Sequence, residues 1–241
     1  MANYVFVHGA WHGGWCWRRI AEPLRRDGHR VFTPSLTGLG DRAHLALPEI
    51  DLDRHVADIA ALIESEELAE VILVGHSYGG MVITGVADRM ATLVRELVYV
   101  DAFVPADGEA VMQLLGPNRR RQFESLAPEI WLLPPMSAEE FGVRDAADRD
   151  WVDRRCVGMP RRCFTQPIRL TGAWQRVPRL TYVLAAQYLR SPFHRYAEAL
   201  RADPRWRVAE IACGHEVMID APDALRWLLR DGIASGERAA Q

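Results

Sequence analysis

The chain has 241 residues, of which 49% are hydrophobic and 25% are charged, a composition typical of a soluble globular protein with one large domain. Its formal net charge of −3 favours neither nucleic acid nor an acidic membrane surface as a partner. All 29 basic residues are arginine, which excludes a mechanism based on a lysine Schiff base.

Targeting and metal-binding patterns are missing from the sequence. The chain starts with neither a signal-peptide pattern nor an apolar run of transmembrane length. The cysteines are scattered and lack the spacing of metal ligands: Cys16, Cys156, Cys163 and Cys213. We therefore expect a reduced, cytoplasmic protein with no metal site. A homodimer is compatible with the sequence, which does not define the oligomeric state.

Short apolar strands and amphipathic helices alternate along the chain. The first part of the pattern predicts strands at 4–7, 30–33, 71–74 and 97–100, and helices at 17–26, 51–65 and 81–87. The last part predicts strands at 180–185 and 206–211 and a closing helix at 222–230. Such alternation is typical of an α/β fold, with a mostly parallel sheet flanked by helices.

The alternation breaks between residues 104 and 167. Proline, arginine and aromatic residues interleave there with short helical pieces at 107–115, 137–141 and 145–155. We interpret residues 104–167 as an inserted helical lid. Residues 1–103 and 168–241 then form the core.

Ser77 is the residue with the clearest chemical meaning. It lies in Gly75-His76-Ser77-Tyr78-Gly79, directly after a predicted strand and before a predicted helix. Gly-x-Ser-x-Gly in that context is the nucleophile elbow of the α/β-hydrolase fold, a sharp turn that exposes the serine hydroxyl at the end of the sheet. We therefore expect Ser77 to be a catalytic nucleophile.

A nucleophilic serine needs a general base and two donors for the oxyanion. The order along the chain in this fold is serine, acid, histidine, and His215 is the histidine that follows the last predicted strand. The oxyanion donors are expected to be the backbone amides of Tyr78 and Ala10. His8 is expected to brace the loop that carries Ala10, and His76 to be a packed, hydrogen-bonded residue.

Four stretches carry a resemblance to a known family. They are 6–17, which reads FVHGAWHGGWCW, together with 33–42, 101–105 and 213–218. They resemble the plant methylesterase and hydroxynitrile lyase branch of the α/β-hydrolases, and more closely its bacterial relatives, the carboxylesterases of the pyrethroid-hydrolase type. The resemblance implies a serine-histidine-acid esterase that acts on a small-molecule ester, with no metal and no organic cofactor.

The acid of the triad departs from the plant pattern. Gln187 stands where the plant enzymes have an aspartate, and glutamine cannot supply the negative charge that stabilises an imidazolium. Asp101, at the end of an earlier predicted strand, is the best substitute. Glu198, Asp203 and Glu216 are weaker candidates, because their helix or loop positions direct them less surely towards the histidine.

Aromatic residues gather in or beside the predicted lid: Phe103, Phe123, Trp131, Phe141, Trp151 and Phe164. We expect Trp11, His12, Phe103 and Trp131 to line an apolar substrate pocket. The other aromatic side chains fit equally well in the core of the lid. The arginines at 119–121 and 161–162 fit either an acidic substrate group or, more commonly, a solvated face.

The sequence thus predicts a serine carboxylic ester hydrolase for small to medium esters with an apolar or aromatic part. Methyl esters of a natural product are a subset suggested by the resemblance alone. Two alternatives stay open: a lactone-opening or biosynthetic enzyme that reuses the serine site, and a catalytically silent ligand-binding protein. Gly9 and Glu216 stand where the lyases of the branch have threonine and lysine, which argues against cyanohydrin cleavage.

Overall fold

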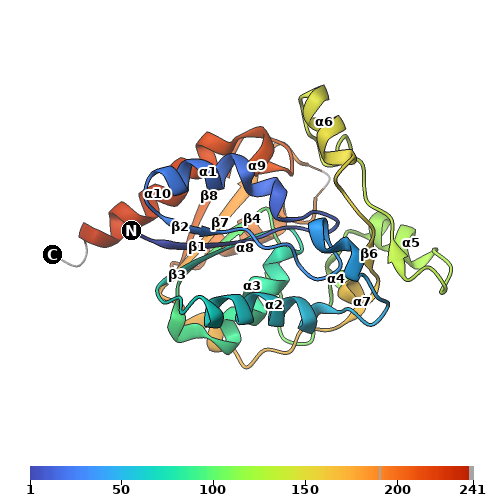
Figure 1. Cartoon of the computed structure of the whole chain (residues 1–241), viewed down its shortest axis with the longest axis horizontal. Helices are drawn as coiled ribbons and strands as arrows, with labels where there is room; N and C mark the ends of the chain where they lie inside the picture. The colour runs from blue at the N-terminus through green and yellow to red at the C-terminus, as the bar shows by residue number, and fades with distance from the viewer. Residues whose placement is uncertain (190, 239–241) are drawn as a thin grey trace.

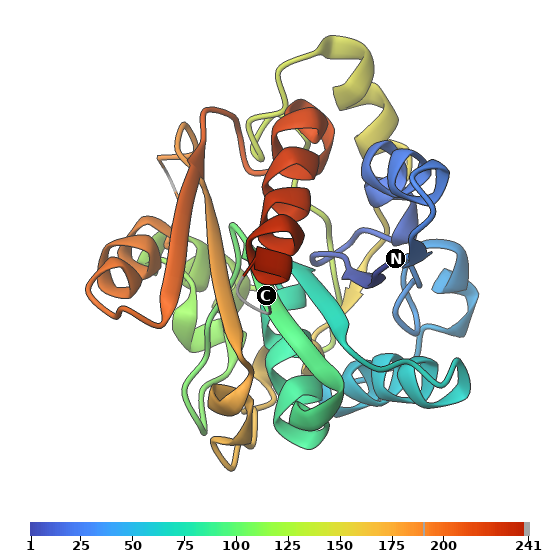
Figure 2. The same cartoon turned by 90° about the vertical axis from the view of Figure 1, so that its left-hand side faces the viewer.

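Six parallel strands form the central sheet of the computed structural model, which describes residues 1–189 and 191–238 (Figure 1). In sheet order they are β2 (Arg30–Phe32), β1 (Asn3–Val7), β3 (Val71–His76), β4 (Val94–Val100), β7 (Arg179–Ala185) and β8 (Trp206–Ile211). Each neighbouring pair is parallel. Figure 2 shows the twist of this sheet, with β8 and β1 on opposite sides of the view.

Helices cover both faces of the sheet. One face carries α1 (Arg18–Arg26), α9 (Val217–Asp220) and α10 (Pro222–Arg238), and the other carries α2 (Leu52–Ser65) and α3 (Gly79–Arg89) (Figure 1). A further helix, α8 (His194–Arg201), packs against β7 and β8. Because both faces are covered, a central strand such as β3 is buried along its whole length and reads as one apolar run.

Residues 104–167, called the insertion below, lie beyond the carboxyl ends of the strands (Figure 1). The insertion contains α4 (Val111–Leu114), α5 (Pro117–Glu124), α6 (Ala146–Asp153) and α7 (Arg162–Thr165). A two-stranded antiparallel ribbon joins β5 (Leu132–Leu133) to β6 (Met159–Pro160). Short 3-10 turns complete the chain: η1 (Gly14–Trp17), η2 (Gly40–Leu45), η3 (Ala91–Leu93) and η4 (Ala173–Arg176).

The predicted α/β fold is confirmed, and all six predicted strands are present. The differences are in short elements. Residues 137–141 form a turn rather than a helix, and the predicted helix at 107–115 shrinks to α4, since Gly108 has a left-handed φ of 81°. Helices α5, α7, α8 and α9 and the ribbon were not predicted. In α5 only Phe123 is buried, so the helix has no apolar periodicity to detect.

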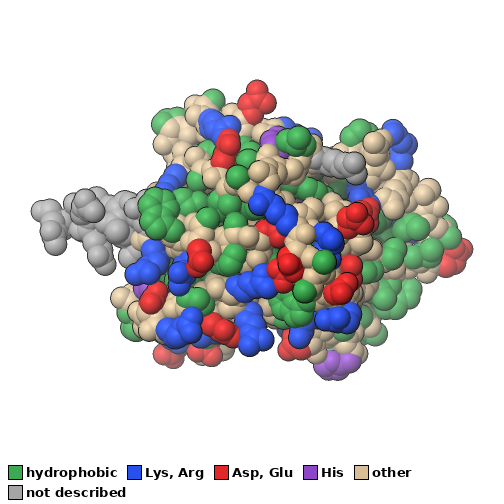
Figure 3. Space-filling view, turned by 90° about the horizontal axis from the view of Figure 1, so that it is seen from above, with side chains coloured by type: hydrophobic (Ala, Val, Ile, Leu, Met, Phe, Trp, Pro, Cys, Tyr) green, Lys and Arg blue, Asp and Glu red, His purple; other side chains and the backbone are tan. Residues whose placement is uncertain are grey.

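The surface seen from above carries arginine and acidic side chains that are interspersed rather than segregated (Figure 3). None of the helices in the described ranges is long and apolar enough to cross a membrane. The predicted core range 168–241 includes residues 190 and 239–241, which lie outside the described residues.

Candidate active site

Ser77 occupies the sharp turn between β3 and α3. Its φ of 53° lies in the left-handed region that side-chain-bearing residues rarely adopt. The turn fits because a Cβ on Gly79 would lie only 2.6 Å from the Val7 carbonyl oxygen. The Phe103 amide donates to the Ser77 carbonyl at 3.2 Å and ties the turn down. The local sequence therefore holds the Ser77 side chain at the carboxyl end of the sheet.

His215 and Asp101 form a buried pair next to this turn. Their Nδ1 and Oδ2 atoms lie 2.6 Å apart, although the residues are 114 positions apart in the sequence. The other oxygen of Asp101 accepts a hydrogen bond from the Ala185 amide at 3.1 Å. Burial raises the pKa of Asp101, while the hydrogen bond and charge of His215 act in the opposite direction. The carboxylate and the imidazole are thus held in one orientation.

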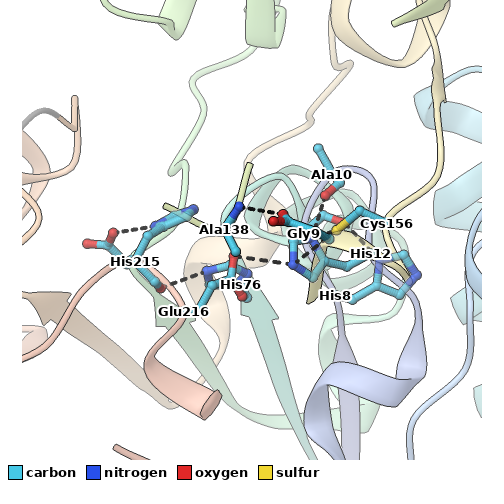
Figure 4. A network of polar contacts seen from close by, with 11 residues as sticks. His8, Gly9, Ala10, His12, His76, Ala138, Cys156, His215 and Glu216 are labelled. Carbon is cyan, nitrogen blue, oxygen red and sulfur yellow. Dashed lines mark hydrogen bonds and ion pairs between the residues drawn. The ribbon is translucent and has the colours of Figure 1, made fainter. Parts of the chain in front are cut away.

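Neighbouring groups fix the His215 ring from several sides. It stacks on Phe193 at 5.3 Å and on Tyr188 at 5.0 Å between ring centroids. Its backbone amide donates to the Phe141 carbonyl at 2.9 Å, and His76 Nε2 lies 3.0 Å from its carbonyl oxygen (Figure 4). Among the hydrogen bonds of the described residues, none joins Ser77 to His215. Both residues line the same cavity.

Ala10 and Tyr78 also border this cavity. Both residues line it, and neither backbone N–H donates to an acceptor among the hydrogen bonds of the described chain. Tyr78 immediately precedes α3, so its amide lies at the positive end of that helix. Its hydroxyl is 2.9 Å from His55 Nδ1, which fixes the side chain away from the amide. Ala10 and Tyr78 therefore have backbone donors without an acceptor in the described chain, on the cavity that Ser77 also lines.

His8 and His76 have the bracing roles that the sequence suggested. His8 Nε2 accepts from the Leu36 amide at 3.0 Å, and its Nδ1 donates to the Gly9 carbonyl at 2.8 Å. Burial lowers the pKa of His8 to about 3 and that of His76 well below its ordinary value. Both imidazoles are therefore neutral parts of the scaffold.

The cavity has a volume of about 570 Å³ and a wall rich in aromatic side chains. Trp11 and Phe103, two of the four predicted pocket residues, are part of that wall, as are Phe123, Phe141 and Phe164. The charged pair Arg119 and Glu140 also lines it, with 3.1 Å between the guanidinium and the carboxylate.

His12 and Trp131 do not line this cavity, contrary to the expectation from the sequence. His12, in the loop between β1 and η1, is 1% exposed. Its Nδ1 turns back to the Ala10 carbonyl oxygen at 2.7 Å, within the same loop. Trp131 lies beside the ribbon of the insertion and is 36% exposed. The wall residues Tyr188 and Phe193 were missed, since they lie in a loop that carries no motif.

Trp11 joins the loop between β1 and η1, residues 8–13 and called the first loop below, to the insertion. Its indole Nε1 donates to the Leu133 carbonyl at 3.1 Å, and its own carbonyl accepts from the Val157 amide at 2.9 Å. Its φ is 66°, a left-handed conformation for a bulky residue. The residue next to Ala10 is therefore hydrogen-bonded to Leu133 in β5 and to Val157, which lies just before β6.

One group of described side chains could hold a metal ion. His76, His215 and Glu216 each offer a ligand atom, and these atoms lie within 4.8 Å of one another. One nitrogen of each imidazole is already hydrogen-bonded, His76 Nε2 to the His215 carbonyl and His215 Nδ1 to Asp101. The Glu216 carboxylate makes no hydrogen bond with a described residue, and the absence of a metal stays a prediction.

Comparison with known proteins places this geometry in a family. The family model described as alpha/beta hydrolase family matches residues 4–226. The chain is 48% identical over 235 residues to a carbendazim hydrolyzing esterase of Nocardioides sp. (strain SG-4G), with 93% of this chain and 97% of that protein covered. It is 38% identical over 105 residues to methylesterase 10 of Arabidopsis thaliana, a match that covers 43% of this chain and 38% of that protein.

Solved structures share the fold at low sequence identity. An extracellular alpha/beta-hydrolase from a Paenibacillus species is 21% identical, with a TM-score of 0.84 and coverage of 95% of this chain and 98% of that one. A pyrethroid hydrolase from Sphingobium faniae JZ-2 is 22% identical, with a TM-score of 0.71 and coverage of 95% and 96%. With the family model matched over most of its length, the chain belongs to the alpha/beta hydrolase family.

Proposed function

We propose that the chain is a serine carboxylic ester hydrolase in which Ser77 is the nucleophile, His215 the general base and Asp101 the orienting acid. The observation that carries the proposal is the buried 2.6 Å contact between His215 and Asp101, beside a serine in a left-handed elbow. The esterase relatives agree with this reaction class.

The reaction follows from these positions. His215 takes the proton from the Ser77 hydroxyl as the oxygen attacks the ester carbonyl, and Asp101 stabilises the imidazolium that forms. The Ala10 and Tyr78 amides hold the negative oxygen of the tetrahedral intermediate. His215 then protonates the leaving alcohol, and water activated by the same imidazole releases the acid from Ser77.

The cavity supports a neutral substrate with an aromatic or apolar part. Its wall is rich in aromatic side chains, and the two charges on it, Arg119 and Glu140, form an ion pair at 3.1 Å. The relative with 48% identity hydrolyses carbendazim, so carbendazim itself is the first substrate to try. The proposal extends to methyl esters of similar size.

Three further parts of the proposal concern the protein as a whole. Residues 104–167 act as a lid over a core of residues 1–103 and 168–241, since Phe123 and Phe141 of this segment form part of the cavity wall. A cytoplasmic location agrees with four cysteines that are all free thiols. The proposal also includes a homodimer, for which no contact of the described residues argues.

The test compares the protein with its Ser77→Ala variant. We expect turnover of p-nitrophenyl acetate and loss of carbendazim, both abolished in Ser77→Ala, and covalent labelling of Ser77 by a fluorophosphonate. Labelling without turnover of any ester would contradict the esterase and favour a lactone-opening or biosynthetic reaction. Failure of both would favour a silent ligand-binding protein.

A further inference from the structure

We propose that His12 and Glu216 form a second imidazole–carboxylate pair, which positions the loop that carries the oxyanion donor Ala10. The inference rests on the proposed function, because it assigns His12 and Glu216 a positioning role in that reaction. Neither residue lines the cavity, so neither is proposed to touch the substrate.

Both nitrogens of the His12 ring face an acceptor. Nδ1 lies 2.7 Å from the Ala10 carbonyl oxygen, and Nε2 lies 3.3 Å from Oε1 of Glu216 (Figure 4). An imidazole that faces two acceptors is best satisfied when both nitrogens carry a proton. Burial alone lowers the pKa of His12, but Cys156 and Glu216 outweigh it and raise the pKa above its ordinary value. The geometry thus fits a protonated ring held between a carbonyl and a carboxylate.

Glu216 depends on this cation. The residue is fully buried, and its carboxylate oxygens make no hydrogen bond with any described residue. His12 is its ion-pair partner. Titratable groups near the pair include His76 and His215, each with a ring nitrogen within 4.8 Å of a Glu216 oxygen, Cys156, whose sulfur is 3.8 Å from Nε2, and the buried Cys16. A buried carboxylate without a cation would be strongly unfavourable, so the pair is a unit.

The pair acts on the loop through the turn around Trp11. The contact between His12 and the Ala10 carbonyl closes this turn across Trp11, whose left-handed φ of 66° needs a bond that fixes it. With the Ala10 carbonyl fixed, the Ala10 amide keeps its direction towards the cavity.

Glu216 also links the two halves of the site. It directly follows His215, whose ring faces Asp101, while its own side chain faces His12. The carboxylate therefore ties the segment of the general base to the oxyanion loop and fixes their separation. A donor displaced by about 1 Å can cost on the order of 100-fold in rate, so such a tie matters for catalysis.

The experiment uses a matched pair of substitutions at His12. His12→Asn keeps an N–H donor near the position of Nδ1, whereas His12→Ala removes it. We expect His12→Ala to lower kcat for p-nitrophenyl acetate by about 10- to 100-fold with KM nearly unchanged, because the lost interaction acts in the transition state. A reversible trifluoromethyl ketone that adds to the serine should lose affinity by a similar factor. His12→Asn should recover part of both losses, because it restores the donor to the Ala10 carbonyl but leaves Glu216 without its cation.

Glu216→Gln gives a second, independent test, because it is isosteric and keeps the volume of the buried side chain. We expect a smaller fall in kcat, about 5- to 10-fold, again without a matching change in KM. Equal defects in His12→Ala and His12→Asn, a rise in KM alone, or unchanged kinetics in all three variants would overturn the positioning role. Loss of the proposed function is distinguishable, since it would appear as an inactive parent protein that no fluorophosphonate labels.

Discussion

Asp101→Asn tests the assignment of the triad acid most directly. Asp101 has a left-handed φ of 42°, a conformation that asparagine tolerates better than most residues, so the backbone can stay in place. The amide oxygen of the new side chain can still accept from the Ala185 amide, as Oδ1 of Asp101 does at 3.1 Å. The substitution therefore changes the group that faces His215 and little else.

The expected loss follows from the hydrogen-bond directions. With its oxygen turned to Ala185, the asparagine presents its NH₂ group to His215 Nδ1, which now lies 2.6 Å from Oδ2 of Asp101. Nδ1 must then accept, and the imidazole carries its proton on Nε2, where it cannot take the serine proton. Forcing this tautomer lowers kcat by about 10⁴-fold, which corresponds to about 5 kcal/mol of transition-state stabilisation.

Steady-state kinetics with p-nitrophenyl acetate measure this loss, and circular dichroism checks the fold. The control is Glu198→Gln, an exposed carboxylate on α8, which should stay within about twofold of the parent kcat. A folded Asp101→Asn protein with kcat within tenfold of the parent would refute the reasoning. The triad acid would then have to be another residue.

Two further predictions concern stability. Arg161 donates to the Phe123 carbonyl in the last turn of α5 at 3.0 Å and to three carbonyls that follow the helix, so Arg161→Met should cost about 2 kcal/mol and speed proteolysis of the insertion. Arg162→Met, which removes one exposed ion pair, is the control and should change little. Burial lowers the pKa of His8 to about 3 and of His55 to about 4, so the unfolded chain binds more protons below pH 6.5. The free energy of unfolding should therefore fall by about 2 kcal/mol per imidazole as the pH is lowered from 7 to 5. A denaturant midpoint that does not change over that range would contradict this prediction.

The sheet was predictable because its strands are buried on both faces. Such strands need continuous apolar runs, and β3 carries one, as does the 97–100 part of β4. The insertion was not predictable in detail, because its elements are short and take their stability from tertiary contacts. The ribbon has two residues on each strand, and the carbonyls after α5 are satisfied by Arg161 from a distant part of the chain.

The site, like the fold, could be predicted from the sequence only in part. Ser77 lies in a local motif, and His215 has a local position between a strand and a helix, so the sequence pointed to both. The contact between His215 and Asp101 could not be chosen from the sequence over other carboxylates, because it crosses 114 residues. Gln187, at the position of the plant acid, is exposed and hydrogen-bonded to Arg144. The sequence did not predict the place of His12, because its ring faces the buried carboxylate of Glu216, which is 204 residues away.

The bonds of Trp11 have a consequence for how this protein could be re-engineered. Its indole and its carbonyl join the first loop to Leu133 and Val157, so the residue beside Ala10 is part of the same hydrogen-bonded unit as the insertion. An insertion taken from a relative could place other groups opposite Trp11 and so leave its indole and carbonyl without their partners. Chimeras that exchange residues 104–167 alone should therefore lose turnover as well as selectivity. The segment to exchange is the insertion together with the first loop.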